Sequence, residues 1–294
     1  MMKKHILFLF LFMFTAIQLH SQKILVIDSL TQKPIPYITV RYNKNDGTYT
    51  DEKGYFTVNN KSNDSVMLSH IAYNNYSIKA ALIKDTIIMS PKTKPLHEII
   101  ITNANSVKHI DFLKKSFNHG SFPISSRVEL VTLIIPGTGN TNAMITKLEL
   151  RFEKKRFEKT EKDIKTLFRI NIYTVQQEQI HDKIFTSAVY NRNSLKQEKV
   201  ELDLTDSDIQ LPENGLFIGI EVIGDVAVNG TLTANNNSVR PLLTDKATND
   251  YTAKTFLRYT FDGKKKLQPL NTVLENNVDP KTKRNLSFGL TLTK

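Results

Sequence analysis

The chain has 294 residues, a formal net charge of +11 at pH 7, and no cysteine or tryptophan. Its length suffices for one large or two ordinary domains, and a hydrophobic fraction of 40% allows packed cores to form. The lack of cysteine excludes disulfides, thiolate metal sites, thiol catalysis and a lipidated cysteine, so a lipoprotein is not expected.

The N-terminal residues follow the order of a signal peptide. Lys3 and Lys4 precede an apolar run at 6–17, and small Ser21 follows it. A run of about a dozen apolar residues is too short to span a bilayer, which needs about 20. We therefore predict a signal peptide at 1–22, cleaved near Ser21, and export to the periplasm, the outer membrane or the medium. No later run reaches the length of a membrane span, so we expect no transmembrane segment in the mature chain.

The positive charge indicates a solvated surface. Basic residues alternate with acidic ones in "EKKRFEKTEKDIK" (153–165), and the purely basic runs at 264–266 and 281–284 are short. No RNP-like aromatic motif or zinc-finger spacing accompanies them. We therefore expect no nucleic-acid partner.

Short runs rich in β-branched and aromatic residues follow one another from residue 23 to residue 102. Asn, Asp, Ser and Gly separate them, which is the pattern of a β-sandwich rather than of alternating strands and helices. The predicted strands are 23–28, 37–42, 54–58, 64–70, 76–82, 85–89 and 97–102.

The stretch "GTYTDEKGYFTV" (47–58) contains acidic residues and glycines, and so raises the question of a metal loop. The register excludes an EF-hand: with Gly47 as the loop glycine, Lys53 would stand at the last ligand position. Asp51 to Gly54 instead has Asp at the first and Gly at the last position of a type I turn. We interpret the stretch as a corner between two strands.

Several motifs in this region occur together in a known order. The pattern Gly-Thr-x-Thr-Asp-x-x-Gly-x-Phe starts at Gly47, Ala72-Tyr73 stands where a Gly-Tyr pair is usual, and "LHEIIIT" (96–102) closes the region. Residues 23–102 thereby resemble the carboxypeptidase regulatory-like domain of exported Bacteroidetes proteins. The resemblance implies a seven-stranded, transthyretin-like β-sandwich.

The same resemblance implies an appendage and not a hydrolase. The zinc carboxypeptidase itself needs a His-x-x-Glu motif with a distant third ligand, and His97, His109, His119 and His181 do not provide it. We therefore expect no catalytic residue, no metal site and no cofactor.

Residues 103–125 are predicted to be a helical linker between two domains. Apolar residues recur there at roughly helical spacing, Ser106 stands where an N-cap would, and Gly120 where a helix would end. The apolar positions are Val107, Ile110, Leu113 and Phe117.

Residues 126–294 are predicted to form a second, jelly-roll-like β-sandwich, which makes the fold all-β. Apolar and charged residues alternate in "KVELDL" (199–204), whereas "LFIGIEVIG" (216–224) is apolar on both faces. The predicted strands are 127–136, 145–153, 166–175, 197–204, 215–224, 254–261 and 285–293.

Some residues in these strands and turns could carry chemistry, although each has a simpler interpretation. Asp203, Asp206 and Asp208 could bind Ca²⁺, but they fit a solvated turn. Glu149 and Glu153 could form a glycosidase pair, but they lie on the polar side of a strand. Four tyrosines could stack on sugars but fit a partial core; they are Tyr49, Tyr55, Tyr73 and Tyr76. The single histidines His70 and His97 fit surface positions.

Two functional hypotheses remain. The first is a non-enzymatic exported protein with a binding, structural or adaptor role at the cell envelope, its partners being envelope proteins or glycans. The second is a carbohydrate-binding or accessory component of an envelope hydrolase or nutrient-uptake system. A concave cluster of aromatic and carboxylate side chains on the second domain would favour the second hypothesis.

Overall fold

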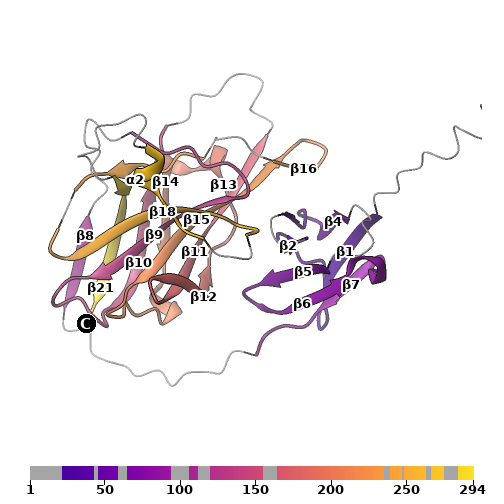
Figure 1. Cartoon of the computed structure of the whole chain (residues 1–294), viewed down its shortest axis with the longest axis horizontal. Helices are drawn as coiled ribbons and strands as arrows, with labels where there is room; N and C mark the ends of the chain where they lie inside the picture. Colours follow the sequence, from indigo (N-terminus) through magenta and orange to yellow (C-terminus); the bar gives the residue numbers. More distant parts are fainter. Residues whose placement is uncertain are drawn as a thin grey trace, which may run out of the picture.

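A computed structural model of the chain describes residues 22–42, 46–58, 65–93, 106–111, 120–154, 164–234, 239–246, 248–262, 266–274 and 284–294. These residues form an all-β fold with two sandwich units, which confirms the predicted fold class (Figure 1). Residues 1–21 of the predicted signal peptide and the strand predicted at 97–102 lie outside the described residues.

The N-terminal unit contains seven described strands in two sheets. One sheet has the order β4-β1-β7 and the other the order β3-β2-β5-β6. Within the first sheet, β1 is antiparallel to β4 and parallel to β7. The elements are β1 (Gln22–Asp28), β2 (Thr39–Arg41), β3 (Gly47–Tyr49), β4 (Tyr55–Val58), β5 (Ser65–His70), β6 (Tyr73–Lys79), the 3₁₀ turn η1 (Ala80–Leu82) and β7 (Thr86–Met89).

The alternation of apolar residues builds the core between these two sheets. Ile24 and Val26 of β1 are fully buried, as are Val40 of β2 and Leu68 of β5 on the facing sheet. Successive side chains of a strand point to opposite faces, so each strand contributes every second residue to this core.

The stretch 47–58 forms the predicted corner. Its first strand, β3, belongs to one sheet and β4 to the other, and the turn between them carries the chain across the sandwich. The amide of Gly54 donates to the carbonyl of Asp51 at 3.0 Å. The Asp51 carboxylate accepts from the amides of Lys53 at 2.9 Å and Tyr55 at 2.8 Å. Asp51 therefore closes the turn with both its backbone and its side chain.

We expect Gly54→Ala to destabilise the N-terminal unit by about 1–3 kcal/mol. Gly54 has φ +78°, and an added Cβ would lie 2.9 Å from Pro34 Cβ and 3.0 Å from the Val26 carbonyl oxygen. Gly139 is the matched control, since its φ is +91° and nothing lies within 4 Å of its Cβ position. Thermal unfolding should show a larger loss for Gly54→Ala than for Gly139→Ala; equal losses would mean that the contacts around the corner add nothing.

The C-terminal unit packs a four-stranded sheet against an eight-stranded one. The smaller sheet has the order β14-β10-β21-β8, and the larger has the order β12-β11-β15-β9-β18-β19, with β13 beside β11 and β16 beside β15. Their strands are β8 (Val107–Asp111), β9 (Val128–Pro136), β10 (Met144–Arg151), β11 (Lys165–Gln176), β12 (Gln179–Thr186), β13 (Tyr190–Asn191), β14 (Lys199–Asp203), β15 (Leu216–Val226), β16 (Leu232–Thr233), β18 (Tyr251–Tyr259), β19 (Gln268–Pro269) and β21 (Phe288–Thr293).

A further short pair and several turns complete this unit. β17 and β20 pair with each other, and the described part of the chain holds one α-helix, α2, which has five residues. No described helix has the length and apolar character needed to cross a membrane. The elements are β17 (Leu243–Thr244), β20 (Asn285–Leu286), α2 (Leu270–Leu274) and the 3₁₀ turns η3 (Arg192–Ser194), η4 (Lys196–Glu198) and η5 (Thr205–Ser207).

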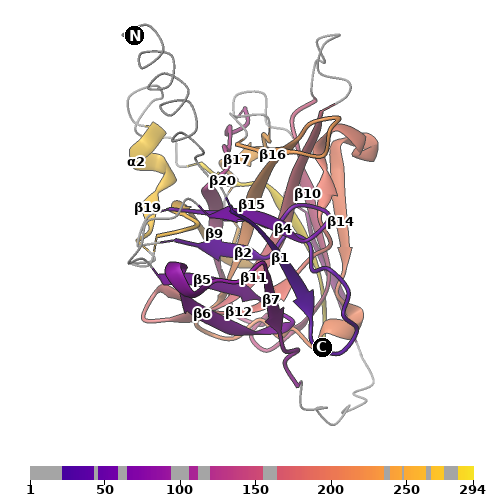
Figure 2. The ribbon, with the colours of Figure 1, turned by 90° about the vertical axis from the view of Figure 1, so that its right-hand side faces the viewer.

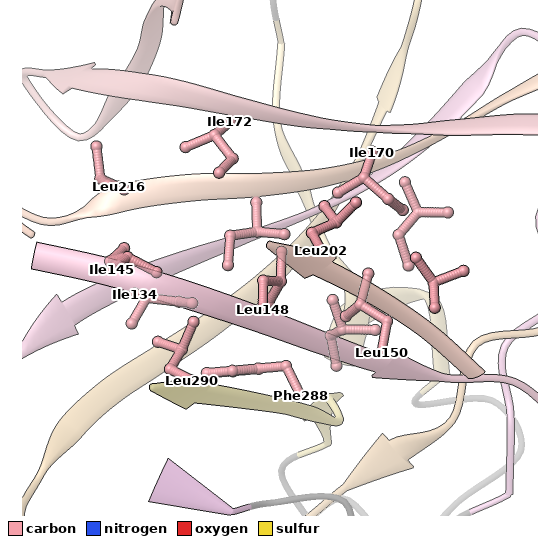
Figure 3. Close-up of a cluster of buried hydrophobic side chains, with 14 of the residues drawn as sticks. Ile134, Ile145, Leu148, Leu150, Ile170, Ile172, Leu202, Leu216, Phe288 and Leu290 are labelled. Carbon is pink, nitrogen blue, oxygen red and sulfur yellow. The ribbon is translucent and has the colours of Figure 1, made fainter. Parts of the chain in front are cut away.

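The chain crosses repeatedly between the two sheets, and their inner faces form the larger core. Figure 3 shows Leu148 and Leu150 of β10 and Phe288 of β21 between the ribbons, together with Ile170 and Ile172 of β11. All five are buried. The even-numbered residues of β11 therefore point inward, which leaves its odd-numbered residues on the outer face of the larger sheet.

The helix predicted within the linker 103–125 is wrong for residues 107–111. These residues form β8, which pairs antiparallel with β21 at the edge of the smaller sheet. Ile110 is buried in the core, but Val107 is 70% exposed, so the apparent helical spacing joined one core residue to one surface residue. The C-terminal unit thus includes residues well before 126. Leu113 and Phe117 lie outside the described residues.

The N-terminal unit packs on the outer face of the larger sheet, as Figure 2 shows with the N-terminal strands in front. Tyr49 of β3 lies in one buried cluster with Leu167 of β11 and Ile223 of β15. The ring of Phe261 lies 5.4 Å from that of Tyr49. A Cβ on Gly47 would lie 2.3 Å from the Phe261 ring, so only glycine permits this approach. The corner stretch is thus also a contact between the two units.

Candidate functional site

Four charged side chains form a row across the outer face of the larger sheet. They come from four neighbouring strands and stand directly opposite one another in the register. Their side chains are between 0 and 11% exposed, which is rare for charged groups that are not paired. In order across β11, β15, β9 and β18, they are Arg169, Glu221, Glu129 and Arg258.

Glu221 accepts hydrogen bonds from both units. Arg169 donates from Nε to Oε2 at 2.7 Å and from Nη2 to Oε1 at 3.1 Å. The hydroxyl of Tyr49 donates to Oε1 at 2.8 Å, and the Asn171 amide donates to Oε2 at 2.8 Å. Each carboxylate oxygen thus has two donors, and one of the four comes from the N-terminal unit.

Arg169 extends this network into the N-terminal unit. Its Nη1 donates to the backbone carbonyl of Tyr37 at 3.1 Å, and its Nη2 donates to the Thr39 hydroxyl at 2.9 Å. The fixed fork of a guanidinium suits such a simultaneous contact with a carboxylate and two further acceptors. The two units therefore share one buried polar network.

Glu129 forms the second half of the row, and its hydrogen-bond donors among the described residues all belong to the C-terminal unit. Arg258 Nε donates to its Oε2 at 2.6 Å, and the Tyr173 hydroxyl and the Asn171 amide donate to its Oε1 at 2.8 and 2.9 Å. Gly219 makes room for this carboxylate, since a Cβ there would lie 2.1 Å from Oε1.

The charges in the row alter the pKa values of their neighbours. Burial alone would raise the pKa of Glu221, but Arg169 and Lys183 outweigh it and hold that pKa well below its ordinary value. Burial lowers the pKa of Lys183 to about 8, with Glu221 opposing and Arg169 adding to the shift. The Lys183 ammonium lies 3.7 Å from Glu221 Oε2. Glu221 is therefore a permanent anion at neutral pH, and Lys183 is mostly a cation.

A cleft of about 400 Å³ opens next to Lys183 between the two units. The N-terminal unit contributes His70 and the C-terminal unit Arg169, so its walls come from both. Burial, followed by the nearby Arg169 and Lys183, lowers the pKa of His70 to about 4, so its ring is neutral at pH 7. The lining residues are Ser69, His70, Ile71, Asn75, Lys92, Arg169, His181, Asp182, Lys183 and Thr186.

The residues considered from sequence for carboxylate chemistry have structural roles. The Asp203 carboxylate accepts from the amide and the hydroxyl of Thr205, and Asp206 lies in the 3₁₀ turn η5 that follows. Asp208 ends this turn in the left-handed region with φ 50°. Among the described residues, no group of three His, Asp or Glu side chains could hold a metal ion.

The two glutamates considered as a glycosidase pair are both in ion pairs. Glu149 lies 3.2 Å from Lys147 and 3.5 Å from Lys199. Glu153 contacts Arg240 at 3.0 Å. Each carboxylate is thus neutralised by a lysine or arginine.

The tyrosines and histidines considered from sequence are dispersed. Tyr49 is buried between the units, whereas the Tyr73 hydroxyl donates to Asp28 at 2.8 Å. Tyr55 lies under the Lys23 ammonium, and Tyr76 packs against the N-terminal core. Of the histidines considered, His70 and His181 line the cleft, whereas His97 lies outside the described residues.

Sequence reasoning missed the charged row itself. Its signal was present, since "VELVTL", "FRINIY", "GIEVIG" and "FLRYT" each place one charged residue inside an apolar strand. A charge inside a strand that is buried on both faces requires a partner of opposite sign nearby.

The comparison with protein families decides the nature of the N-terminal unit. Residues 25–101 match the model of the CarboxypepD_reg-like domain. The N-terminal unit is a CarboxypepD_reg-like domain. This confirms the carboxypeptidase regulatory-like domain predicted from the motifs around Gly47, and the domain is a non-catalytic regulatory fold.

Comparisons of the whole chain add only distant likenesses. The cysteine protease and lectin-like domains of Cwp84, a surface layer associated protein of Clostridium difficile, align at 9% identity with a TM-score of 0.34, over 88% of this chain and 59% of that one. BcpA, the major pilin subunit of Bacillus cereus, aligns at 9% identity and a TM-score of 0.15, over 94% and 95%. Neither TM-score defines the fold of this chain, and no curated protein matches its sequence.

Proposed function

We propose that this chain is a non-enzymatic exported protein of the cell envelope, in which the CarboxypepD_reg-like domain and the C-terminal sandwich act together as one binding or adaptor module. The observation that carries the proposal is the buried network between Tyr49, Glu221 and Arg169. A hydrogen bond to a buried charge is worth about 1.5–3 kcal/mol. Several such bonds between the units favour joint action over two domains on a flexible tether.

The chemistry of the interdomain cleft supports binding rather than turnover. Its described walls offer ammonium, guanidinium, imidazole, hydroxyl and amide groups and one carboxylate, that of Asp182. Catalysis needs a nucleophile with an adjacent base, or a metal, held at the reacting atoms. Lys183 and Arg169 are instead arranged around an acceptor, Glu221, that is already fully bonded. Among the described residues that line it, the cleft has no phenyl, phenol or indole face, so stacking on a neutral sugar is not favoured.

Export is supported by the order of charged, apolar and small residues at the N-terminus. The mature chain would then begin near Gln22, the first residue of β1. We therefore propose a location in the periplasm, at the outer membrane or outside the cell.

The proposal predicts a docked pair of domains in an exported chain. Small-angle scattering of the mature chain should give a compact particle, and Tyr49→Ala should increase its radius of gyration because the side chain is buried between the units. Tyr55→Ala is the matched control on the other sheet of the same domain. N-terminal sequencing of protein from the native envelope should find Gln22 or a neighbour first.

Three results would refute this function. They are an extended mature chain, a cytoplasmic protein that retains Met1, and turnover of peptide or glycan substrates by the purified protein.

A further inference from the structure

The buried network leaves a surplus of positive charge at the cleft. Glu129 and Glu221 are balanced by Arg258 and Arg169, so the charge of Lys183 is in excess. Both oxygens of Glu221 already accept two hydrogen bonds each, and Lys183 lies at 3.7 Å, beyond hydrogen-bond distance. An ammonium that is 28% exposed can therefore still bind a further anion.

A second cation and a weak opposing charge add to this surplus. Lys92 lines the same cleft from the N-terminal domain. Asp182 is the one acidic residue that lines the cleft in the described part of the chain; its side chain is 74% exposed and lies 3.1 Å from the His181 ring. The charge of Asp182 is therefore screened by water, whereas the charge of Lys183 acts within a more buried wall.

Neutral donors complete the lining. The amide of Ala72 donates to Nδ1 of His70 at 3.2 Å, so in the neutral ring the proton resides on Nε2, which is then a donor. The Ser69 hydroxyl and the Asn75 amide lie in the same wall. This set suits the oxygens of an anion that also carries polar groups, and the lack of aromatic faces disfavours a neutral sugar or an apolar ligand.

We propose that the cleft between the two domains binds a small hydrophilic anion with a carboxylate or phosphate group, held by Lys183 from the C-terminal sandwich and Lys92 from the CarboxypepD_reg-like domain. The two lysines come from different domains, so the anion binds only the docked pair and stabilises it. The inference rests on the docking used in the proposed function and adds a ligand class to it.

Calorimetric titration of the mature chain tests this site. Glucuronate represents a carboxylate, inorganic phosphate represents the other source, and glucose is the neutral control. If only one of glucuronate and phosphate gives binding heat, that result identifies which kind of anion the site binds. No binding heat is expected from glucose. Lys183→Gln and Lys92→Gln should each weaken binding about tenfold or more, whereas Lys196→Gln, at an exposed lysine of η4, should not.

Circular dichroism and the scattering profile check that the variants retain the fold. If Lys183→Gln unfolds, the binding measured with Lys92→Gln decides whether the anion site exists. No heat from either anion with a compact wild-type particle would overturn the anion site and leave the domain docking intact. An extended wild-type particle would overturn both. Binding that persists unchanged in Lys183→Gln and Lys92→Gln would also overturn the site, since the anion would then bind elsewhere.

Discussion

Replacement of Glu221 by glutamine should destabilise the protein by about 3–5 kcal/mol, the usual cost of removing one partner from a buried ion pair. Glutamine retains the shape and one acceptor oxygen, so the loss comes from the charge. Arg169, whose side chain is 4% exposed, would be left with its positive charge buried and with Lys183 nearby. Urea unfolding monitored by circular dichroism measures the change.

Glu201→Gln is the matched control for this substitution. Glu201 lies in β14 of the smaller sheet, with its side chain 42% exposed; it forms an ion pair with Lys199 and lies 3.5 Å from Lys147. An exposed pair of this kind contributes about 0–1 kcal/mol. Equal losses for Glu221→Gln and Glu201→Gln would show that the charged row contributes no more than a surface pair.

The same variant should have a weaker dependence of stability on acid pH. The pKa of Glu221 in the folded protein lies well below its ordinary value of about 4.3. A carboxylate with a lowered pKa contributes stability above its unfolded pKa, and that contribution is lost as the pH falls toward the folded pKa. The stability difference between wild type and Glu221→Gln should therefore narrow below about pH 4. A constant difference down to pH 3 would contradict the low pKa of Glu221.

The fold was largely predictable because its strands follow simple period-two rules. Val200 and Leu202 of β14 point into the core, and Glu201 and Asp203 point outward, as their alternation indicates. The corner at Asp51 was predictable because Asp and Gly have defined roles in a type I turn. In β8, by contrast, the apolar residues Val107 and Ile110 lie three positions apart, a spacing that is also typical of a helix. The pairing with β21, which comes from the far end of the chain, decided otherwise.

The site was less predictable, because it depends on registers between distant strands. Strand β15 was correctly interpreted as buried on both faces. Glu221 lies on that strand, but the side chain that pairs with it is determined by the register between β11 and β15. The contact of Glu221 with Tyr49 is determined by the packing of the two domains. Tyr49 was interpreted as partial core filling, whereas it is a buried hydrogen-bond donor between the domains. Local sequence patterns indicate neither the register between two distant strands nor the sheet face on which the other domain packs.

Gly219→Ala should destabilise the protein by about 3 kcal/mol or more, because overpacking and lost hydrogen bonds to a charge add together. The new Cβ would lie 2.1 Å from Glu129 Oε1 and 3.2 Å from the Tyr173 ring. Glu129 is fully buried and cannot move aside without giving up its bonds to Tyr173 and Asn171. Gly219 lies in the middle of β15 opposite Asn171, so the backbone has no simple way to retreat.

A double-mutant cycle with Glu129→Ala isolates this contact. Glu129→Ala is itself destabilising, since Arg258 loses its carboxylate, but the arginine is 11% exposed and retains the Tyr173 hydroxyl as a neighbour at 2.7 Å. In that background the carboxylate no longer occupies the space beside residue 219, so Gly219→Ala should cost less than about 1 kcal/mol. The resulting coupling of about 2 kcal/mol or more lies in the range measured for residues in direct contact. Chemical denaturation of the four proteins gives the coupling energy. Purely additive losses would mean that Gly219 serves the backbone of β15 and not the Glu129 carboxylate.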